Sequence, residues 1–286
     1  MTYRQLSDQT VAALMQRYAE GEARWMTRIA MEEITGLSRV DLLLKANDEV
    51  SDFRAGQIKT VAERLLKGEP LQYILGYETF MGLRLKVTPD VLIPRPETEQ
   101  LVQLILDRVG QTPDLRVLDI ATGSGCIALA LARQLPFAQV DALDISDAAL
   151  AVARENAKTL KIPVNFFRGD ILSLPEGLGL YDLIVCNPPY VLDSERDEVP
   201  QNVLLHEPHT ALFVPDSDSL RFYLPVADFA ARHLAPGGTL WFELNPLTAK
   251  PLAEQMRKTV AFSDITLTPD IHGKTRYLTA SARADA

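Results

Sequence analysis

The feature that most constrains the fold of this chain is an alternation of short apolar runs with helical stretches, which begins at Leu115. The run at 181–186 lacks polar alternation, as is typical of a strand that is buried on both faces of a sheet. Strands are expected at 115–120, 139–143, 164–168, 181–186, 238–244, 262–267 and 276–280, and helices at 124–134, 147–160, 218–234 and 248–260. This alternation predicts an α/β domain with a seven-stranded, mostly parallel sheet that is covered by helices on both faces.

Residues 1–74 follow a different pattern, because their apolar side chains recur at helical spacing throughout. Breaks are expected at Gly21, Gly36 and Gly68, and Ser38 and Ser51 are expected to be helix N-caps. We therefore predict a small all-helical N-terminal domain of about four helices. Such a domain serves either packing or the recognition of a partner, and its residues alone do not separate the two.

The stretch at 75–95 is expected to join the two regions as a β-hairpin. Leu83, Leu85 and Val87 alternate after Gly82, which is typical of a strand. The prolines on either side of Arg95 then hold that residue in an extended turn ahead of a helix. We place the domains at 1–74, 75–95 and 96–286.

The first strand of the alternating region leads into a glycine turn that suits a bound nucleotide-like group. Gly123 and Gly125 allow positive φ and a close approach of the backbone to a ligand, and the N-terminus of the next helix favours negative charge. Roughly twenty residues later the second strand ends at Asp144, where a carboxylate can accept hydrogen bonds from ribose hydroxyls. Asp170 follows the third strand and suits an adenine amino group. These residues together predict an adenosine-type cofactor.

The identity of that cofactor is open on these residues alone. Gly123-x-Gly125-x-x-Ala128 matches the dinucleotide-binding fingerprint, so a nicotinamide enzyme is an alternative, as is a turn that binds no ligand. Asp119 argues against nicotinamide, because an acid inside the strand before the turn can face the ammonium group of a cofactor. The loop after the fourth strand also offers nothing obvious to hydride transfer.

That loop reads Asn187-Pro188-Pro189-Tyr190 and is predicted to be rigid, with carbonyl groups free to face a ligand. The Asn187 side chain offers an acceptor, and Pro189 has no N–H with which to engage the Pro188 carbonyl. Two convergent acceptors suit a planar –NH2 group, and Tyr190 can lie against the flat face of such a group. The alternative is a turn that only ends the strand, with Asn187 capping the local backbone.

Composition limits the class of partner and the compartment. A formal net charge of −9 argues against a protein that mainly grips a nucleic-acid backbone. Cys126 and Cys186 lie inside apolar segments and are expected to be free thiols in a reducing cytoplasm. No apolar run approaches the ~20 residues that span a bilayer, and the N-terminus lacks the pattern of a signal peptide, so no membrane partner is expected.

The segment His206-Glu207-Pro208-His209 contains residue types that bind metals. A pair of ligands three or four residues apart needs a helix, however, and Pro208 would break that helix. We therefore expect no metal site here.

These motifs, in this order, resemble the class I S-adenosylmethionine-dependent methyltransferases, and most specifically the peptide chain release factor glutamine N5-methyltransferase family (HemK/PrmC type). The likeness covers essentially the whole chain and rests on residues 68–76, 93–99, 119–125, 187–190, 206–208 and 270–276. Two departures stand out. Ala121 occupies a position where the family usually has glycine, which is tolerable if φ is negative there. The loop at 243–247 lacks the Glu-x-Gly of the family, so we take no site residue from it.

The resemblance implies a Rossmann-like methyltransferase fold and transfer of a methyl group from S-adenosyl-L-methionine to the side-chain amide nitrogen (N5) of the glutamine in the Gly-Gly-Gln motif of release factors. It implies that the cofactor lies over Ala121, Thr122, Gly123, Ser124 and Gly125, with Asp144 at the ribose and with Asp170 and Ile171 at the adenine. It also implies that Asn187 contacts both cofactor and substrate. Asn187, Pro188 and Tyr190 would be the catalytic residues, and Pro189 would join them in binding the substrate.

Other functions remain as alternatives. They are methylation of a glutamine in a ribosomal protein, methylation of an exocyclic amine of a DNA or RNA base, an NAD-dependent activity, and S-adenosylmethionine binding without catalysis. The acidic charge argues against the nucleic-acid reading, and the helical residues 1–74 supply a module for docking a folded protein. We therefore expect release factors as partners and no direct contact with nucleic acid.

Overall fold

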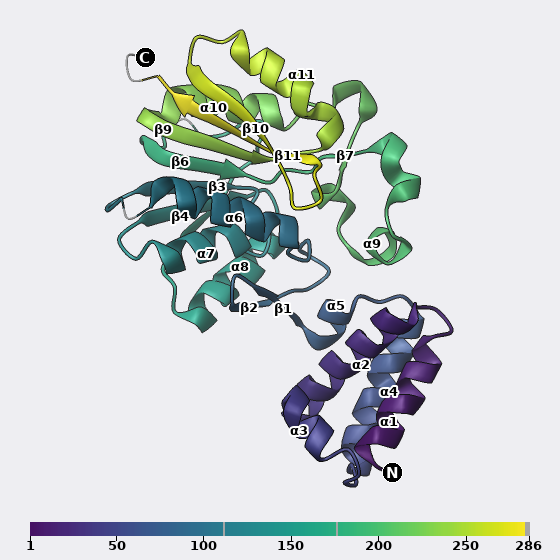
Figure 1. Ribbon diagram of the computed structural model, residues 1–286. Coiled ribbons are helices and arrows are strands. Elements are labelled where there is room, and N and C mark those ends of the chain that lie inside the picture. Colours follow the sequence, from purple (N-terminus) through teal and green to yellow (C-terminus); the bar gives the residue numbers. More distant parts are fainter. Residues whose placement is uncertain (111, 176, 284–286) are drawn as a thin grey trace. The chain divides into compact units, whose positions relative to one another are not determined.

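The computed structural model describes residues 1–110, 112–175 and 177–283, and the chain forms two compact units (Figure 1). The first unit consists of Met1–Gly76 and Pro200–His206, and the second of Tyr77–Val199 and Glu207–Ala286. The short segment 200–206 therefore belongs to the first unit, although the chain on both sides of it belongs to the second. In the three described ranges no helix is long and apolar enough to cross a membrane.

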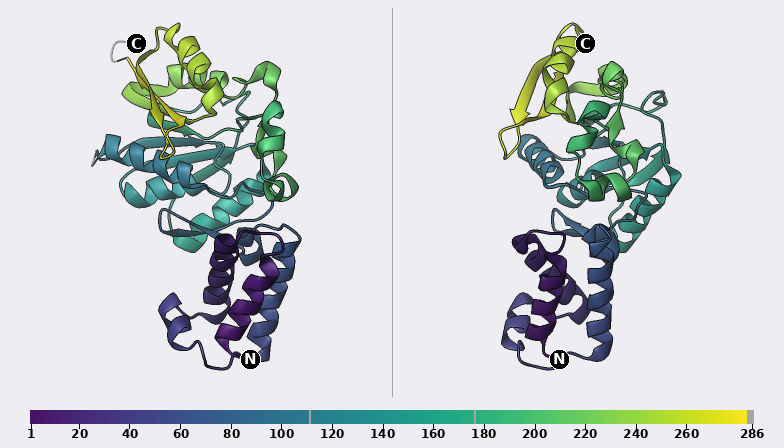
Figure 2. Two further views of the ribbon diagram at one scale, coloured as in Figure 1. Left: turned by 45° about the vertical axis from the view of Figure 1, so that its right-hand side comes forward. Right: turned by 90° about the vertical axis from the view of Figure 1, so that its right-hand side faces the viewer.

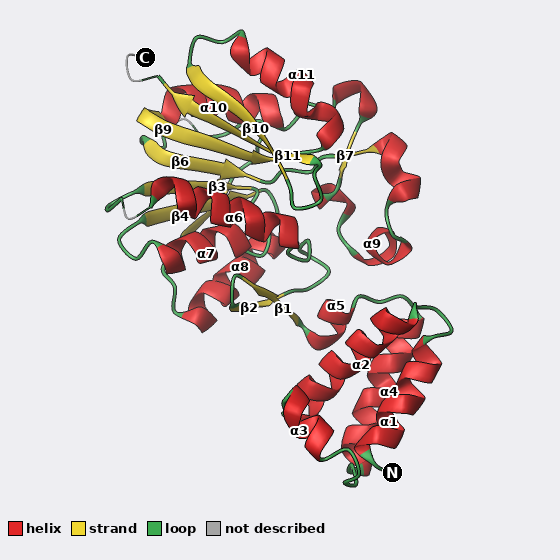
Figure 3. Ribbon diagram, viewed as in Figure 1, coloured by secondary structure: helices red, strands yellow, loops and turns green. Residues whose placement is uncertain are grey.

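The first unit is helical throughout, as Figure 3 shows. Its helices are α1 (Tyr3–Leu14), α2 (Glu20–Thr35), α3 (Arg39–Leu44), α4 (Asp52–Leu66), α5 (Leu71–Leu75) and α9 (Gln201–His206). The predicted N-caps are confirmed, because Ser38 accepts from the backbone N–H of Asp41 and Ser51 from that of Arg54. Gly36 ends α2 with φ +70°, as expected. The predicted break at Gly21 is wrong, since the helix already begins at Glu20 and a first-turn glycine is tolerated there.

The second unit is built on a seven-stranded sheet with the order β10-β11-β9-β6-β3-β4-β5. Its strands are β3 (Arg116–Ile120), β4 (Gln139–Asp144), β5 (Asn165–Arg168), β6 (Tyr181–Cys186), β9 (Leu234–Glu243), β10 (Phe262–Pro269) and β11 (Thr275–Ala282). Strand β11 runs antiparallel to both of its neighbours, and the other neighbouring pairs are parallel. The predicted seven-stranded, mostly parallel sheet is confirmed.

Helices cover both faces of this sheet (Figures 1 and 2). Helices α6 (Pro96–Val109), α7 (Cys126–Gln134) and α8 (Asp147–Leu160) lie on one face, and α10 (Tyr223–His233) and α11 (Pro246–Arg257) lie on the other. The strands supply both cores because their side chains alternate: Val117 packs with α6 and α7, whereas Leu118 and Ile120 pack with α10 and α11. All three side chains are fully buried.

Smaller elements complete the second unit. Strands β1 (Tyr77–Phe80) and β2 (Leu83–Lys86) form an antiparallel hairpin. The sequence did not predict the parallel pair β7 (Val191–Leu192) and β8 (Phe213–Val214), nor the short 3-10 helices at Asp193–Glu198, His209–Ala211 and Asp216–Asp218. Asn156 of α8 fastens the hairpin, because its side chain accepts from Lys86 N (2.7 Å) and donates to Lys86 O and Ser124 O (both 3.0 Å).

The strand register brings four residues at or just after strand ends to one edge of the sheet. Ile120 of β3 pairs with Cys186 of β6 and with Leu143 of β4, and Cys186 pairs in turn with Phe242 of β9. The residues that follow these strand positions are Ala121, Asp144, Asn187 and Glu243. They therefore lie side by side at the carboxyl edge, where the neighbours β3 and β6 diverge into different loops. Open α/β sheets bind their ligands at such a switch point.

Candidate active site

A cavity of about 500 Å³ opens at this edge of the sheet in the second unit. Volumes of this order accommodate small molecules and cofactors. The predicted site residues that line the cavity are Ala121, Thr122, Gly123, Ser124, Asp144, Asp170, Ile171, Asn187 and Pro189. The remaining predicted residues, Gly125, Pro188 and Tyr190, lie outside its lining. One cavity thus unites the glycine turn, both strand-end acids and the Asn-Pro-Pro-Tyr loop.

The glycine turn leaves β3 through three residues in left-handed conformations. Ala121 has φ +63°, Gly123 +54° and Gly125 +82°. The condition under which alanine is readily tolerated here, a negative φ, is therefore not met, because the chain turns sharply after Ile120 and Thr122 N donates to Leu143 O (2.9 Å). Gly125 serves helix packing, since an added Cβ would lie 3.2 Å from Leu129 Cδ1 and equally close to a neighbouring α8 side chain. A Cβ at Gly123 would meet no atom within 4 Å.

Asp119 braces this turn from below. Its side chain is fully buried, and Oδ2 accepts hydrogen bonds from Thr122 Oγ1 (2.6 Å) and Ala128 N (3.2 Å). Burial raises the pKa of this carboxyl to about 7. Among the described residues Oδ1 has no hydrogen-bond partner, and Asp119 is absent from the lining of the cavity. The expectation that it faces a cofactor ammonium directly is therefore not supported, although a cation over the turn would favour its ionised form.

The two acids at the ends of β4 and β5 keep acceptor capacity toward the cavity. Asp144 accepts from Gly123 N through Oδ2 and from Ser146 N through Oδ1, both at 2.9 Å, and burial raises its pKa. Asp170 accepts from Leu172 N through Oδ1 (2.9 Å), and Oδ2 accepts from no donor among the described residues. Each carboxylate oxygen can accept more than one hydrogen bond. With the apolar Ile171 beside them, these acceptors fit the hydroxyls and amino group of an adenosine.

Asn187 lines this cavity, and the two polar atoms of its side-chain amide differ in their hydrogen bonding. Its Nδ2 donates to Thr98 Oγ1 (3.2 Å), while Oδ1 accepts from no donor in the part of the chain that the structure describes. Pro188 is buried, and Tyr190 turns its hydroxyl away to donate to Glu243 Oε1 (2.9 Å). The acceptor predicted for Asn187 is thus present, whereas Tyr190 contacts the interior of the protein.

Glu243 and Thr98 are two polar residues of this site that the sequence analysis did not select. Glu243 is 1% exposed and accepts from Thr98 Oγ1 through Oε2 (2.8 Å) in addition to Tyr190. Burial raises the pKa of Glu243, and the Thr98 and Tyr190 hydroxyls and the positive charge of Arg276 oppose that rise. The signal was available for Glu243, since it ends an apolar strand as Asp144 does. Thr98 gave no signal beyond its place in the first turn of a helix.

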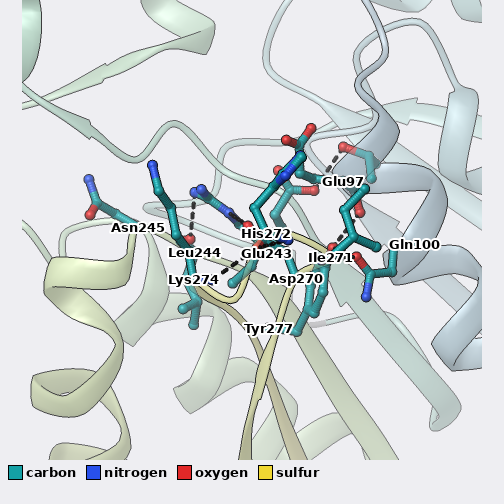
Figure 4. A network of polar contacts seen from close by, with 12 residues as sticks. Glu97, Gln100, Glu243, Leu244, Asn245, Asp270, Ile271, His272, Lys274 and Tyr277 are labelled. Carbon is teal, nitrogen blue, oxygen red and sulfur yellow. Dashed lines mark hydrogen bonds and ion pairs between the residues drawn. The ribbon is translucent and has the colours of Figure 1, made fainter. Parts of the chain in front are cut away.

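A network of polar contacts surrounds Glu243 and joins β9, α6 and the turn between β10 and β11 (Figure 4). Asp270 accepts from Arg276 Nε (3.2 Å) and from two backbone N–H groups of its own turn. Arg276 also donates to Leu244 O (3.3 Å), and its guanidinium lies 5.9 Å from the centre of the Tyr190 ring. In the loop after β9, Asn245 caps α11 and donates to Tyr190 O (3.1 Å). The loop that the sequence left unassigned therefore holds Tyr190 at two points, its hydroxyl through Glu243 and its backbone carbonyl through Asn245.

The His-Glu-Pro segment holds the Pro-Arg-Pro turn. Glu207 is 4% exposed, pairs with Arg95 at 2.5 Å and accepts from Ile93 N at 3.0 Å. Arg95 lines the cavity, so this ion pair fixes one of its walls. Within the described residues no group of three or more His, Cys, Asp or Glu side chains is arranged to hold a metal ion.

Comparisons with known proteins agree with these features. Residues 5–76 match the family described as PrmC N-terminal domain, and residues 97–213 match the methyltransferase small domain. The release factor glutamine methyltransferase of Flavobacterium psychrophilum is 41% identical over 96% of this chain and 97% of its own. The protein of the same name from Bacteroides thetaiotaomicron is 42% identical over 94% of this chain and 96% of its own.

A solved structure resembles the fold more distantly. The T. thermophilus 16S rRNA N2 G1207 methyltransferase, in complex with AdoMet and guanosine, has a TM-score of 0.52 and 19% identity. The match covers 72% of this chain and 50% of that one. At this identity the likeness concerns the fold alone.

Proposed function

We propose, from the premise that this chain belongs to the release factor glutamine methyltransferase family, that it methylates peptide chain release factors on the side-chain amide nitrogen (N5) of the glutamine in their Gly-Gly-Gln motif. The cofactor of this proposal is S-adenosyl-L-methionine. One observation carries the proposal: Asn187, with an acceptor oxygen that no described donor engages, lines the same cavity as the glycine turn and Asp144.

The residues around the cavity suit this cofactor. When bound, S-adenosylmethionine supplies a methyl group that is activated on a positively charged sulfur. In our proposal the residues from Ala121 to Ser124 form the floor of its site, Asp144 accepts from the ribose hydroxyls, and Asp170 and Ile171 flank the adenine. The buried carboxylate of Asp119 adds negative charge beneath the turn, which favours a cationic ligand above it.

The chain's own residues would position the substrate. An amide nitrogen is a poor nucleophile because its lone pair is delocalised into the carbonyl group. Asn187 Oδ1 and the Pro188 carbonyl would accept the two N–H groups, orient the nitrogen and favour the positive charge that develops on it. When bound, the cofactor would supply the methyl group from its sulfur, which would leave with the electron pair of the carbon–sulfur bond, while Asn187 and Pro188 hold the nitrogen that receives the methyl group. The nitrogen then loses one proton to solvent, so no strong base is needed.

The helical residues 1–74 are the proposed docking module for the release factor. Their helix α3 exposes Val40, Leu43 and Leu44 at 63%, 69% and 80%, and exposed apolar side chains that gather in one place mark interaction surfaces. Both cysteines are free thiols, which fits the cytoplasm where the substrate would be met.

The decisive experiment measures transfer of a labelled methyl group from S-adenosylmethionine to purified release factor. A release factor with its Gly-Gly-Gln glutamine changed to alanine, a set of ribosomal proteins and duplex DNA serve as the comparison substrates. Label on the wild-type release factor alone is the expected result. Label on DNA, or equal label on the alanine variant, would refute the proposal.

Asn187→Ala tests the site within the same assay. Loss of the acceptor should reduce the rate by at least about a hundredfold, because an interaction made in the transition state is removed. Cofactor affinity, measured by calorimetry, should change by less than about fivefold, since the glycine turn and both acids remain. A variant that no longer binds the cofactor would assign Asn187 to cofactor binding instead.

A further inference from the structure

The side-chain amide of Asn187 has two ends of nearly equal size and opposite hydrogen-bonding character. One end is an acceptor oxygen and the other an –NH2 donor, and a half-turn of the side chain exchanges them. A substrate –NH2 group is recognised by the oxygen and repelled by the amino group. The site therefore works only if something fixes which end faces the cavity.

We infer that Thr98 and Glu243 fix this orientation, so that Asn187 presents its oxygen to the substrate amide. Both act through Asn187 and are positioning residues. The inference deepens the proposed methyl transfer and rests on it.

The chain of hydrogen bonds begins at Glu243, because a carboxylate has no proton to donate and can only accept hydrogen bonds. It is 1% exposed and accepts from the hydroxyls of Thr98 (2.8 Å) and Tyr190 (2.9 Å) on its two oxygens. Burial raises the pKa of Glu243, and Arg276, which is anchored by Asp270, opposes that rise with its positive charge. Because this buried carboxylate accepts from both hydroxyls, the single proton of each hydroxyl is used in its hydrogen bond to the carboxylate.

Because its proton is used in this way, Thr98 can act only as a hydrogen-bond acceptor toward Asn187. A threonine hydroxyl has one proton, and the contact with Glu243 uses it. Only lone pairs of Thr98 Oγ1 remain for Asn187, which lies 3.2 Å away. Asn187 must therefore direct its –NH2 group toward Thr98, and its oxygen is left for the substrate. The opposite orientation would place two acceptors against each other.

The positions of these residues in the fold suit a fixed orientation of the Asn187 side chain. Thr98 is 2% exposed in the first turn of α6, and Glu243 is the last residue of β9. Asn187 follows β6, the strand that neighbours β9. Thr98 and Glu243 therefore stand on a helix and a strand of the second unit, and Asn187 directly follows a strand, which suits a preorganised site.

The test uses Thr98→Val, which removes the hydroxyl but keeps the shape, and Thr98→Ser, which restores the hydroxyl. With release factor as substrate, Thr98→Val should lower kcat at least about tenfold, and Thr98→Ser should recover most of that loss. The dissociation constant for S-adenosylmethionine should stay within about threefold in both variants. Thr27→Val is the matched control, because Thr27 is equally buried in the helical unit but its hydroxyl has no partner among the described residues.

The outcomes separate the two proposals. A wild-type protein that transfers no methyl group to release factor contradicts the proposed function. An active wild type with Thr98→Val within twofold of its kcat contradicts the positioning role. A loss that Thr98→Ser does not recover, or one matched by loss of cofactor affinity, also contradicts it, because a purely structural threonine would behave in that way.

Glu243→Gln supplies a second, independent test. The glutamine –NH2 group can donate to Thr98, which releases the threonine proton toward Asn187 and favours the wrong orientation. Because both changes break one chain of hydrogen bonds, Thr98→Val combined with Glu243→Gln should lower kcat by no more than the larger single effect. Multiplicative losses would show that the two residues act separately and would overturn the inference.

Nuclear magnetic resonance gives a readout that does not depend on activity. In protein labelled with 15N-asparagine, the side-chain signal of Asn187 is identified as the one missing from Asn187→Ala. Its Nδ2 protons should move to higher field and exchange faster with water in Thr98→Val, but not in Thr98→Ser. An unchanged signal in Thr98→Val would mean that Asn187 does not donate to Thr98.

Discussion

At the scale of single residues, Ala121 shows how the site stores strain. A non-glycine residue at φ +63° places its Cβ near the following carbonyl, which costs about 1–2 kcal/mol relative to a right-handed conformation. The residue also lines the cavity at the point where the chain leaves β3. The surrounding structure must therefore hold the turn against its local preference, as is common at functional sites.

We expect Ala121→Gly to stabilise the free protein by about 0.5–1 kcal/mol, because the relief of strain exceeds the entropy that glycine adds to the unfolded chain. Urea unfolding monitored by circular dichroism measures this change. Ala132→Gly, inside helix α7, is the control and should destabilise by about 1 kcal/mol. A destabilised Ala121→Gly would show that the methyl group makes packing contacts worth more than the strain.

The raised pKa of Asp119 predicts how the free energy of unfolding depends on pH. Its pKa is about 7 in the folded protein, above the value of 3.8 for an exposed aspartate. For a raised pKa, the contribution to stability is fully present below pH 3.8 and is lost as pH rises through 7. A shift of about three units corresponds to a loss of up to about 4 kcal/mol.

The variant Asp119→Asn should remove this dependence, because its side chain does not ionise. Relative to Asp119→Asn, the wild type should lose stability between about pH 4 and pH 7 and then level off. Urea unfolding at a series of pH values, without cofactor, measures the difference between the two proteins. A difference that stays constant across this range would mean that Asp119 titrates near its ordinary pKa.

At the scale of secondary-structure elements, the strands were predictable because apolar runs of β3, β4 and β6 are short and bounded by turn residues. Their register was not, since nothing in the local sequence states that Ile120 pairs with Cys186 and Leu143. This gap explains why Thr98 escaped the sequence analysis, and why the contacts of Glu243 could not be predicted although its place at the end of a strand was visible. Their relation to Asn187 depends on three elements that come together only in the folded sheet.

The positive φ of Ala121 could not be predicted from the sequence either. Sequence preference assigns an alanine to a right-handed or extended conformation. In the structure, the bond between Thr122 N and Leu143 O overrides that preference, and it depends on the neighbouring strand β4. Tyr190 illustrates the same limit, since its partner Glu243 lies 53 residues away along the chain.

Helix α3 carries the prediction for partner binding. Val40, Leu43 and Leu44 stand at i, i+3 and i+4 and so lie on one face of the helix. Changing Leu43 and Leu44 together to alanine should raise KM for release factor at least about tenfold, as expected for apolar anchors of an interface. The dissociation constant for S-adenosylmethionine should not change, because the cavity belongs to the second unit.

Exposed apolar residues elsewhere provide the control for this prediction. Phe137 and Val260, in the second unit, are 73% and 77% exposed, and their double change to alanine should leave KM within twofold. Surface substitutions of this kind alter stability by about 0.5 kcal/mol or less. An α3 variant with the KM of the wild type would exclude this face of the helix from docking.

At the scale of the whole molecule, the division into two units predicts which part of the protein cofactor binding stabilises. Every residue that lines the cavity belongs to the second unit. A ligand at a hundredfold excess over its dissociation constant stabilises the structure that binds it by about 2.7 kcal/mol. If the units unfold separately, this stabilisation is confined to the second unit.

Hydrogen exchange with and without S-adenosylmethionine measures this directly. Slowly exchanging amides of β3, β4, β6 and β9 should slow by up to about a hundredfold, whereas those of α1, α2 and α4 should keep their rates. The segment at 200–206 is the sharpest probe, because it groups with the helical unit although the chain on both sides of it belongs to the second. It should follow α4 rather than the sheet. Asp144→Ala, which removes the proposed ribose acceptor, should abolish the protection in β3 and β4. Equal protection of both units would mean that they unfold as one cooperative structure and would contradict this prediction.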